Sequence, residues 1–145
     1  MDNVNFRHIL PIQLRFNDVD TFGHVNNTVY FSFYDLGKTT YFAKLRKKKP
    51  PLKDMGIVIV NLQADFLSPI FPTEQVAVQT AVVEIGIKSF RMHQRVINTE
   101  TNEVKCICNT ILVGFDKETN TSRTIPAEWK QAIAEFEGNE VVIKQ

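Results

Sequence analysis

The fold is decided by residues 16–30, which read FNDVDTFGHVNNTVY and join a strand-like run to the longest helical run of the chain. Upstream of this stretch, apolar residues alternate with other residues, which is the two-residue period of a half-buried strand. Downstream, large rings recur at three- and four-residue spacing from Tyr30 to Leu45, which is typical of a helix. We therefore expect a strand over about 10–17, a turn, and a helix over about 27–45 that is apolar on most sides and buried.

The turn between the two runs carries reactive side chains that lie close together. Gly23 permits a sharp turn, and Asn26 is a favoured cap for the first amides of the helix. A helix start carries roughly half a positive charge and several free N–H groups, so amides that the cap leaves unpaired can polarise a carbonyl. Asp20 lies a few residues earlier, where a carboxylate could act as base or nucleophile toward that carbonyl.

This turn also resembles a known family motif. Eight defined positions match the Asp-x-Asp-x-x-Gly-His-Val-Asn-Asn-x-x-Tyr variant of the 4-hydroxybenzoyl-CoA thioesterase family: Asp18, Asp20, Gly23, His24, Val25, Asn26, Asn27 and Tyr30. The resemblance implies an α+β hotdog fold, in which an antiparallel five-stranded sheet wraps around a long central helix and a short C-terminal helix follows. It further implies one hotdog thioesterase domain over residues 1–145 that hydrolyses acyl-CoA thioesters without a cofactor.

The order of elements along the rest of the chain agrees with this fold. Strand-like alternation covers four further segments, at about 57–67, 74–86, 89–99 and 103–115. An apolar stripe from Trp129 to Phe136, closed by Gly138, predicts a short amphipathic helix. Because strands and helices do not alternate, the order is typical of the α+β class with an antiparallel sheet.

Composition excludes several classes of protein. A chain of 145 residues fits one domain and buries about two-thirds of its unfolded surface, enough for a single core. Its 43% hydrophobic and 23% charged residues are normal for a globular protein, and a net charge of +1 argues against a general nucleic-acid binder. The N-terminus lacks a signal-peptide pattern and no apolar run approaches the ~20 residues of a membrane span, so we expect a cytoplasmic protein without a membrane partner.

Three other features have simpler interpretations. Cys106 and Cys108 lie two apart in a strand-like run, where a disulfide would be strained, so we expect reduced thiols in the core. No spacing of His, Cys or Asp indicates a metal site. The basic run 46–49 is either a solvated helix end or a contact for the phosphates of coenzyme A. A nucleic-acid role is the least favoured interpretation.

The proposed chemistry needs few groups. A thioester is a good electrophile whose leaving thiol has a pKa of about 8.5, so a carboxylate and N–H donors for the oxyanion are enough. We hypothesise that Asp20 is the nucleophile or general base and, from the motif, that the amide of Asn27 is the oxyanion donor. Taken alone, Asp20 is equally an acid that stabilises a helix start, and Asp18 is interpreted as structural. His24 either orients water or substrate, or pins the turn through a backbone carbonyl.

The resemblance also implies substrate-binding residues and an assembly. In the family, two subunits join their sheets side by side and acyl-CoA lies across the boundary, so we expect a homodimer or homotetramer, which would also remove exposed sheet edges. A lysine at the turn into the fourth strand would contact a phosphate of the nucleotide, although such a lysine is also commonly just solvated. The expected substrate-binding residues are Gly23, Val25, Asn26 and Tyr30 in the motif, and Lys88 and Ser89 at that turn.

Three alternative functions stay open. The substrate is an acyl carrier protein thioester in a close variant of the same activity. A non-catalytic hotdog module would bind acyl-CoA and release no thiol. A hotdog dehydratase is disfavoured because it needs a His and a carboxylate paired across the site, and the motif places His24 on the same turn as Asp20.

Overall fold

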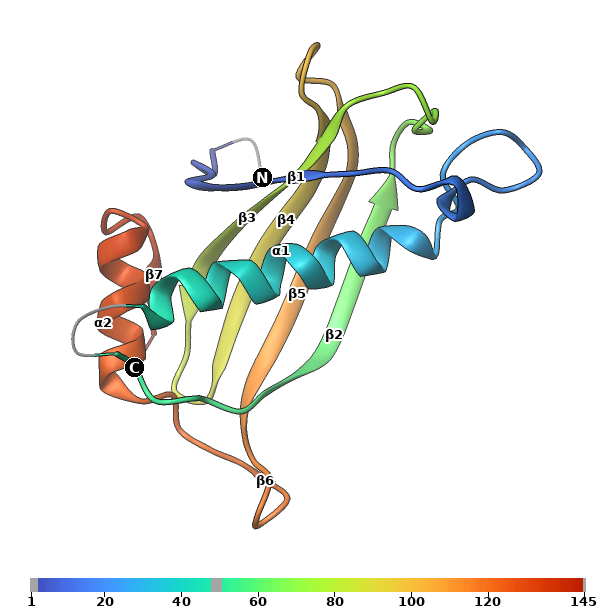
Figure 1. The fold of residues 1–145 in the computed structure, drawn as a ribbon. Helices are drawn as coiled ribbons and strands as arrows, with labels where there is room; N and C mark the ends of the chain where they lie inside the picture. The colour runs from blue at the N-terminus through green and yellow to red at the C-terminus, as the bar shows by residue number, and fades with distance from the viewer. Residues whose placement is uncertain (1–2, 48–50, 145) are drawn as a thin grey trace.

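The computed structural model describes residues 3–47 and 51–144. Figure 1 shows the arrangement of the elements in space. Along the chain they are β1 (His8–Ile12), the short 3-10 helix η1 (Phe16–Asp18), α1 (Val29–Arg46), β2 (Ile57–Phe66), β3 (Val76–Ile85), β4 (Ser89–Asn98), β5 (Val104–Asp116), β6 (Thr121–Ser122), α2 (Ala127–Phe136) and β7 (Val142–Ile143).

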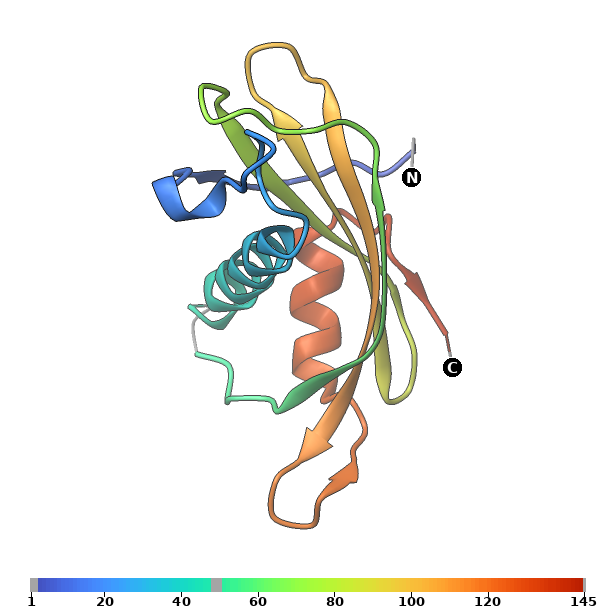
Figure 2. The same ribbon diagram turned by 90° about the vertical axis from the view of Figure 1, so that its right-hand side faces the viewer.

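One curved sheet holds the molecule together. Its main strands follow the order β1-β3-β4-β5-β2 and all pair antiparallel, while the two short strands β6 and β7 attach to β5 and β3. Both helices lie on the same concave face, and the sheet curves around α1 (Figure 2). The predicted α+β hotdog fold with five main strands is therefore confirmed. The two short strands were not predicted, because a two-residue strand has no period to detect.

Helix α1 approaches the sheet closely at Gly37. A Cβ atom there would lie 2.6 Å from Val78 Cγ1 and 2.9 Å from Thr80 Oγ1, so any larger residue would push the helix away from the sheet. The amide of Gln94 donates a hydrogen bond of 2.9 Å to the carbonyl of Tyr34 and thereby ties β4 to α1. The sheet thus holds the helix at a fixed height.

The opposite face of α1 is less buried than the sequence indicated. Phe31 and Leu36 are 43% and 51% exposed in the single chain. The prediction of a helix buried on most sides is therefore wrong for this face.

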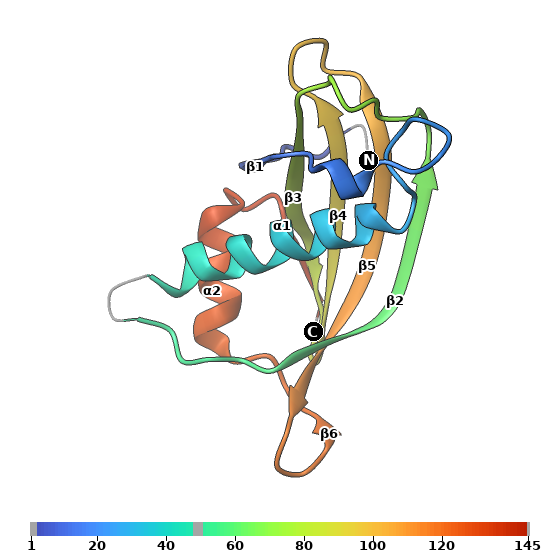
Figure 3. The same ribbon diagram turned by 45° about the vertical axis from the view of Figure 1, so that its right-hand side comes forward.

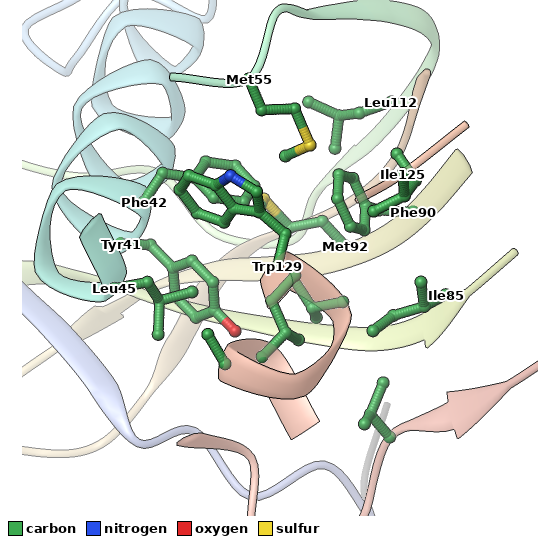
Figure 4. Packing of buried hydrophobic residues seen from close by; sticks show 14 of the residues in the cluster. Tyr41, Phe42, Leu45, Met55, Ile85, Phe90, Met92, Leu112, Ile125 and Trp129 are labelled. Carbon is green, nitrogen blue, oxygen red and sulfur yellow. The ribbon is translucent and has the colours of Figure 1, made fainter. Parts of the chain in front are cut away.

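The core divides into two clusters along α1. The first lies between the C-terminal half of α1, the helix α2 and the sheet (Figures 3 and 4). In it the ring of Phe42 contacts the rings of Tyr41, Phe90 and Trp129. The second lies under the N-terminal half of α1 and includes Tyr30, Phe33, Tyr34, Val25, Ile70, Cys106 and Cys108. Both cysteines are buried free thiols, as expected.

Two predicted boundaries at the motif were wrong. The first strand ends at Ile12 instead of near residue 17, because the carboxylate of Asp18 accepts the Arg15 N–H at 2.9 Å and folds the chain into η1. The helix begins at Val29 instead of near residue 27, because the Asn26 side chain accepts the Thr28 N–H at 2.9 Å and forms a turn of its own. Asn26 does cap backbone amides, but it does so one step before the helix.

Candidate active site

The motif folds into a compact loop whose two arms pair with each other. The Asn26 N–H donates to the Asp18 carbonyl at 2.9 Å, and the Asp20 N–H donates to the His24 carbonyl at 3.0 Å. At the tip, Gly23 has φ of +85°, a conformation that residues with a side chain rarely adopt. The predicted sharp turn at Gly23 is confirmed. In Figure 1 this loop projects at the N-terminal end of α1.

Asp18 is a structural residue, as the sequence indicated. It is only 1% exposed, and its carboxylate accepts hydrogen bonds from the Arg15 backbone and pairs with the Arg15 guanidinium at 3.0 Å. This pair between the buried Asp18 and the exposed Arg15 fixes η1 and the arm that leads to Asp20.

Asp20 lines a hollow at the surface of the loop. Its Oδ1 atom accepts the Phe22 N–H at 2.9 Å, which holds the carboxylate, and its side chain is half-buried. The hollow has a volume of about 370 Å³ and is lined by Leu14, Arg15, Phe16, Val19, Asp20 and Pro72. Its walls come from η1 and from the segment after β2. None of these residues belongs to α1.

The backbone amide of Asn27, the predicted oxyanion donor, differs from the amides of its two neighbours. The backbone amides on either side of it are paired, Asn26 N–H with Asp18 and Thr28 N–H with the Asn26 side chain. Within residues 3–47 and 51–144 the Asn27 N–H has no acceptor, and the residue is exposed. An unpaired amide therefore stands just before the first turn of α1, where the helix dipole favours negative charge.

His24 is held by aromatic contacts. Its ring stacks on Phe22 with centroids 6.3 Å apart and meets the edge of Phe71 at 6.5 Å. No carbonyl in the described part of the chain accepts a bond from its ring nitrogens, so the predicted pin to a backbone carbonyl is not seen.

Val25 and Tyr30 lie behind the loop in the core. Val25 is 1% exposed, and its N–H donates to the Ile70 carbonyl at 2.8 Å. Tyr30 is 2% exposed and meets the ring of Phe66 at 5.2 Å, and burial raises the pKa of its phenol to about 12. In the single chain these two residues support the loop from inside.

Lys88 and Ser89 lie at the opposite end of the sheet. Ser89 and Val58 both pair with Val113, so they lie at the same level of the sheet. The Asp20 loop lies beside the other end of β2, at Phe66. Eight residues of strand separate these levels, roughly 25 Å at 3.3 Å a residue. One chain therefore does not bring Lys88 and Asp20 together.

The segment after β2 is the part of the site that sequence reasoning missed. Its pattern indicates only a loop, yet it supplies Ile70, Phe71 and Pro72 to the Asp20 loop. Two prolines that flank Ile70 and Phe71 were a signal of a rigid apolar segment. Nothing in the pattern indicated which element it contacts.

The described residues hold neither a cluster of metal ligands nor a membrane-spanning helix. In residues 3–47 and 51–144, no three His, Cys, Asp or Glu side chains gather as a possible metal site. In the same ranges no helix has the length and apolar character that crossing a membrane requires.

Known proteins share this architecture. A thioesterase from Thermus thermophilus, solved with coenzyme A and Zn, has a TM-score of 0.80 at 26% identity and covers 92% of this chain and 96% of that one. Protein SAV2348 from Staphylococcus aureus, solved with CoA, has a TM-score of 0.80 over 95% of this chain and 88% of that one; its 12% identity shows the fold alone. The uncharacterized protein YsmA of Bacillus subtilis (strain 168) is 27% identical over 130 residues, 89% of this chain and 86% of that protein. Residues 14–134 match the model of one family, and the chain therefore belongs to the thioesterase-like superfamily.

Proposed function

We propose that this protein is an acyl-CoA thioester hydrolase of the 4-hydroxybenzoyl-CoA thioesterase type. The observation that carries the proposal is the presence of two reactive groups on the same loop. Asp20 is a half-buried carboxylate on a hollow of about 370 Å³, and Asn27 presents an amide without an acceptor among the described residues. These are a base or nucleophile and an oxyanion donor, the two groups that thioester cleavage requires.

In this mechanism the thioester oxygen accepts the Asn27 N–H while the carbonyl carbon faces Asp20. The Phe22 N–H holds one carboxylate oxygen of Asp20, and the other oxygen has no partner within the described chain. That free oxygen either attacks the carbon, forming an anhydride that water then cleaves, or removes a proton from an attacking water. In both routes the C–S bond breaks and the thiolate of coenzyme A leaves. His24, whose ring is held by Phe22 and Phe71, orients the water or the substrate.

The edge strand β2 supports a dimer with sites shared between subunits. It ends the main strand order, and Val58, Ile59 and Val60 on it are 39%, 45% and 58% exposed. Exposed apolar edges favour pairing with another strand. If β2 pairs antiparallel with its copy across a two-fold axis, the β3–β4 turn of the second subunit comes to the end of the joint sheet where Asp20 lies. Lys88 and Ser89 of the partner subunit would then hold the nucleotide.

The comparisons support coenzyme A as the carrier. The relative from Thermus thermophilus is a thioesterase solved with coenzyme A, and it is similar over nearly the whole of both chains. We extend that ligand to this chain and place the reaction in the cytoplasm. An acyl carrier protein thioester remains the close variant.

The test is thiol release from a panel of aliphatic and aromatic acyl-CoA thioesters. Asp20→Asn should lower turnover about 100-fold or more while the protein stays folded, because the amide keeps the bond from Phe22 but cannot attack or accept a proton. The matched control is Asp116→Asn. Asp116 Oδ1 accepts the Glu118 N–H at 2.9 Å, the same local turn as at Asp20, but at the far end of β5.

Each result of this test has a defined meaning. Turnover by wild type and Asp116→Asn, with loss in Asp20→Asn, supports the mechanism. Unchanged turnover in Asp20→Asn would rule out its role. Binding of acyl-CoA by wild type without any thiol release would identify a non-catalytic binding module.

A further inference from the structure

A buried lysine lies next to the candidate active site and takes no part in the proposed chemistry. Lys105, in β5, is 4% exposed, although lysine is almost never fully buried unless it is paired. Its ammonium group has three acceptors in the structure: Glu103 Oε1 at 2.6 Å, Glu74 Oε1 at 2.7 Å and the Pro69 carbonyl at 3.1 Å. All three protons of the ammonium therefore have an acceptor.

Two of these acceptors, Glu74 and the Pro69 carbonyl, belong to residues 67–74, which we call the support segment. The third, Glu103, accepts a hydrogen bond of 3.0 Å from the hydroxyl of Ser68 in the same segment. The Leu67 N–H and Ser68 N–H donate to the carbonyl of Lys105 at 2.9 and 3.1 Å. At the other end of the segment, Glu74 Oε2 accepts the Phe71 N–H at 2.7 Å. Backbone and side chain of Lys105 thus hold the support segment at its beginning, middle and end.

The opposite side of the support segment holds the Asp20 loop. The carbonyl of Ile70 accepts the Val25 N–H at 2.8 Å, the ring of Phe71 meets the ring of His24, and Pro72 lines the hollow with Asp20. Ile70 is fully buried, so its carbonyl cannot shift without disturbing the core. A continuous path therefore runs from the ammonium of Lys105 through the support segment to the loop that carries Asp20 and Asn27.

We propose that Lys105 is a positioning residue for the hydrolysis, which it aligns by fixing the support segment against the Asp20 loop. The inference rests on the proposed function and deepens it. From Cys106 onward the β5 backbone is paired with β2 and β4 without help from this side chain, and Lys105 itself lies at the register shift between β4 and β5. Removal of the ammonium would leave the carboxylates of Glu74 and Glu103 facing each other beside the segment, and their repulsion would displace it.

Lys105 and its two carboxylate partners stay charged, so their ion pairs can hold the support segment continuously. Burial works against the charge of Lys105, but hydrogen bonds to Glu103 and Glu74 outweigh burial and raise the pKa of the lysine. Hydrogen bonds from Lys105 likewise dominate the lowering of the pKa of Glu103. The three groups therefore remain charged throughout the neutral range.

The experiment compares Lys105→Met with a matched control at the other end of α1, Tyr41→Phe. Tyr41 is also buried, and its hydroxyl donates to the buried carboxylate of Glu137 at 2.6 Å. Both variants lose a buried polar contact and should lower the melting temperature. Lys105→Met should lower kcat for acyl-CoA about 10- to 100-fold with less than a threefold change in KM, because small misplacements of reacting groups cost rate. Tyr41→Phe should keep kcat within about twofold.

Two further variants separate positioning from simple loss of structure. Lys105→Arg keeps a cation with several donors and should restore at least half of the lost kcat on a logarithmic scale. If Lys105→Met does not fold, the triple variant Lys105→Met, Glu74→Gln, Glu103→Gln removes the unpaired charges and should fold with the same loss of kcat.

A second readout does not depend on activity. Hydrogen exchange of the Val25 amide, which bonds to Ile70, should accelerate at least tenfold in Lys105→Met or the triple variant and stay unchanged in Tyr41→Phe. Wild-type kcat with unchanged exchange would overturn the positioning role. If wild type hydrolyses no thioester but exchange still accelerates in Lys105→Met, Lys105 does hold the support segment and the proposed function is wrong.

Discussion

The Asp20 loop and the C-terminal end of α1 use aromatic residues in opposite ways. At the C-terminal end, the rings of Tyr41, Phe42 and Trp129 are at most 5% exposed and form the centre of the larger core cluster (Figure 4). In the segment that precedes α1, Phe16 and Phe22 beside Asp20 are 95% and 82% exposed. Since burial of apolar area is the main source of stability, the end next to α2 stabilises the fold. Under the proposed function, the exposed rings beside Asp20 are available to a substrate or a second subunit.

The buried charges differ between the ends as well. Near Asp20, Lys105 has two carboxylates at 2.6–2.7 Å, so its charge is well compensated. Near α2, Glu137 is 3% exposed and accepts bonds from Tyr41 and Val82, but its nearest cation, Arg7, is 3.8 Å away. The charge of Lys105 is balanced by two carboxylates, whereas burial disfavours the charged form of Glu137. This difference predicts distinct responses to mutation and pH.

The largest effect on stability should come from Trp129→Ala. The substitution opens a cavity in the larger cluster and removes the bond from the indole N–H to the Lys53 carbonyl, which together should cost about 3–5 kcal/mol. Urea unfolding measures the loss, and turnover per folded molecule should not change. Phe22→Ala is the counterpart at the other end and should change stability by no more than about 0.5 kcal/mol. Equal losses from both variants would show that the exposed rings are part of the core.

A smaller effect on the free energy of unfolding should appear when pH changes. Its sign should be opposite for Glu137, near α2, and Glu74, near the Asp20 loop. Burial raises the pKa of Glu137. Its stabilising contribution is therefore complete below the ordinary glutamate pKa of about 4.3 and is lost as pH rises through the folded value. Burial also acts to raise the pKa of Glu74, but hydrogen bonds from Lys105, Phe71 and Asn98 outweigh it and lower that pKa. Its contribution is present above about 4.3 and is lost as pH falls through the folded value.

Unfolding free energies of wild type, Glu137→Gln and Glu74→Gln between about pH 3 and 8 test these signs. Relative to wild type, Glu137→Gln should gain stability as pH rises, and Glu74→Gln should gain stability as pH falls. Parallel curves for all three proteins would show that neither carboxyl changes its pKa on folding.

The smallest predicted effect concerns the turn at the far end of the sheet. Lys88 is exposed, and its hydrogen bond to Ser122 Oγ is long, at 3.5 Å. This weak bond leaves the ammonium able to turn toward a phosphate. Lys88→Ala should raise KM for acyl-CoA about three- to tenfold, corresponding to about 1 kcal/mol for an exposed ion pair, and kcat should not change. Lys44→Ala, an exposed lysine on α1, is the control. An unchanged KM in Lys88→Ala would place the nucleotide elsewhere.

Local features of the candidate site could be predicted, and features that depend on distant partners could not. The positive φ of Gly23, the buried role of Asp18 and the capping by Asn26 follow from side chains acting on backbone within a few residues. The end of β1 was misplaced because Asp18 and Arg15 bend a chain whose alternation of apolar residues continues. The short strand β7 pairs parallel with β3, and two residues carry no pattern of their own.

The sequence by itself determined the order of the five main strands and two helices and the sharp turn at Gly23, because periodicity and turn residues act over short separations. Only the tertiary structure decided what supports that loop. Lys105 comes from a strand far along the chain, and it contacts Pro69, Glu74 and, through Ile70, Val25 solely because of how β5 pairs with its neighbours. Strand register depends on the whole sheet, and one-residue shifts reverse the face of every side chain. A buried lysine and an exposed one therefore look the same in the sequence.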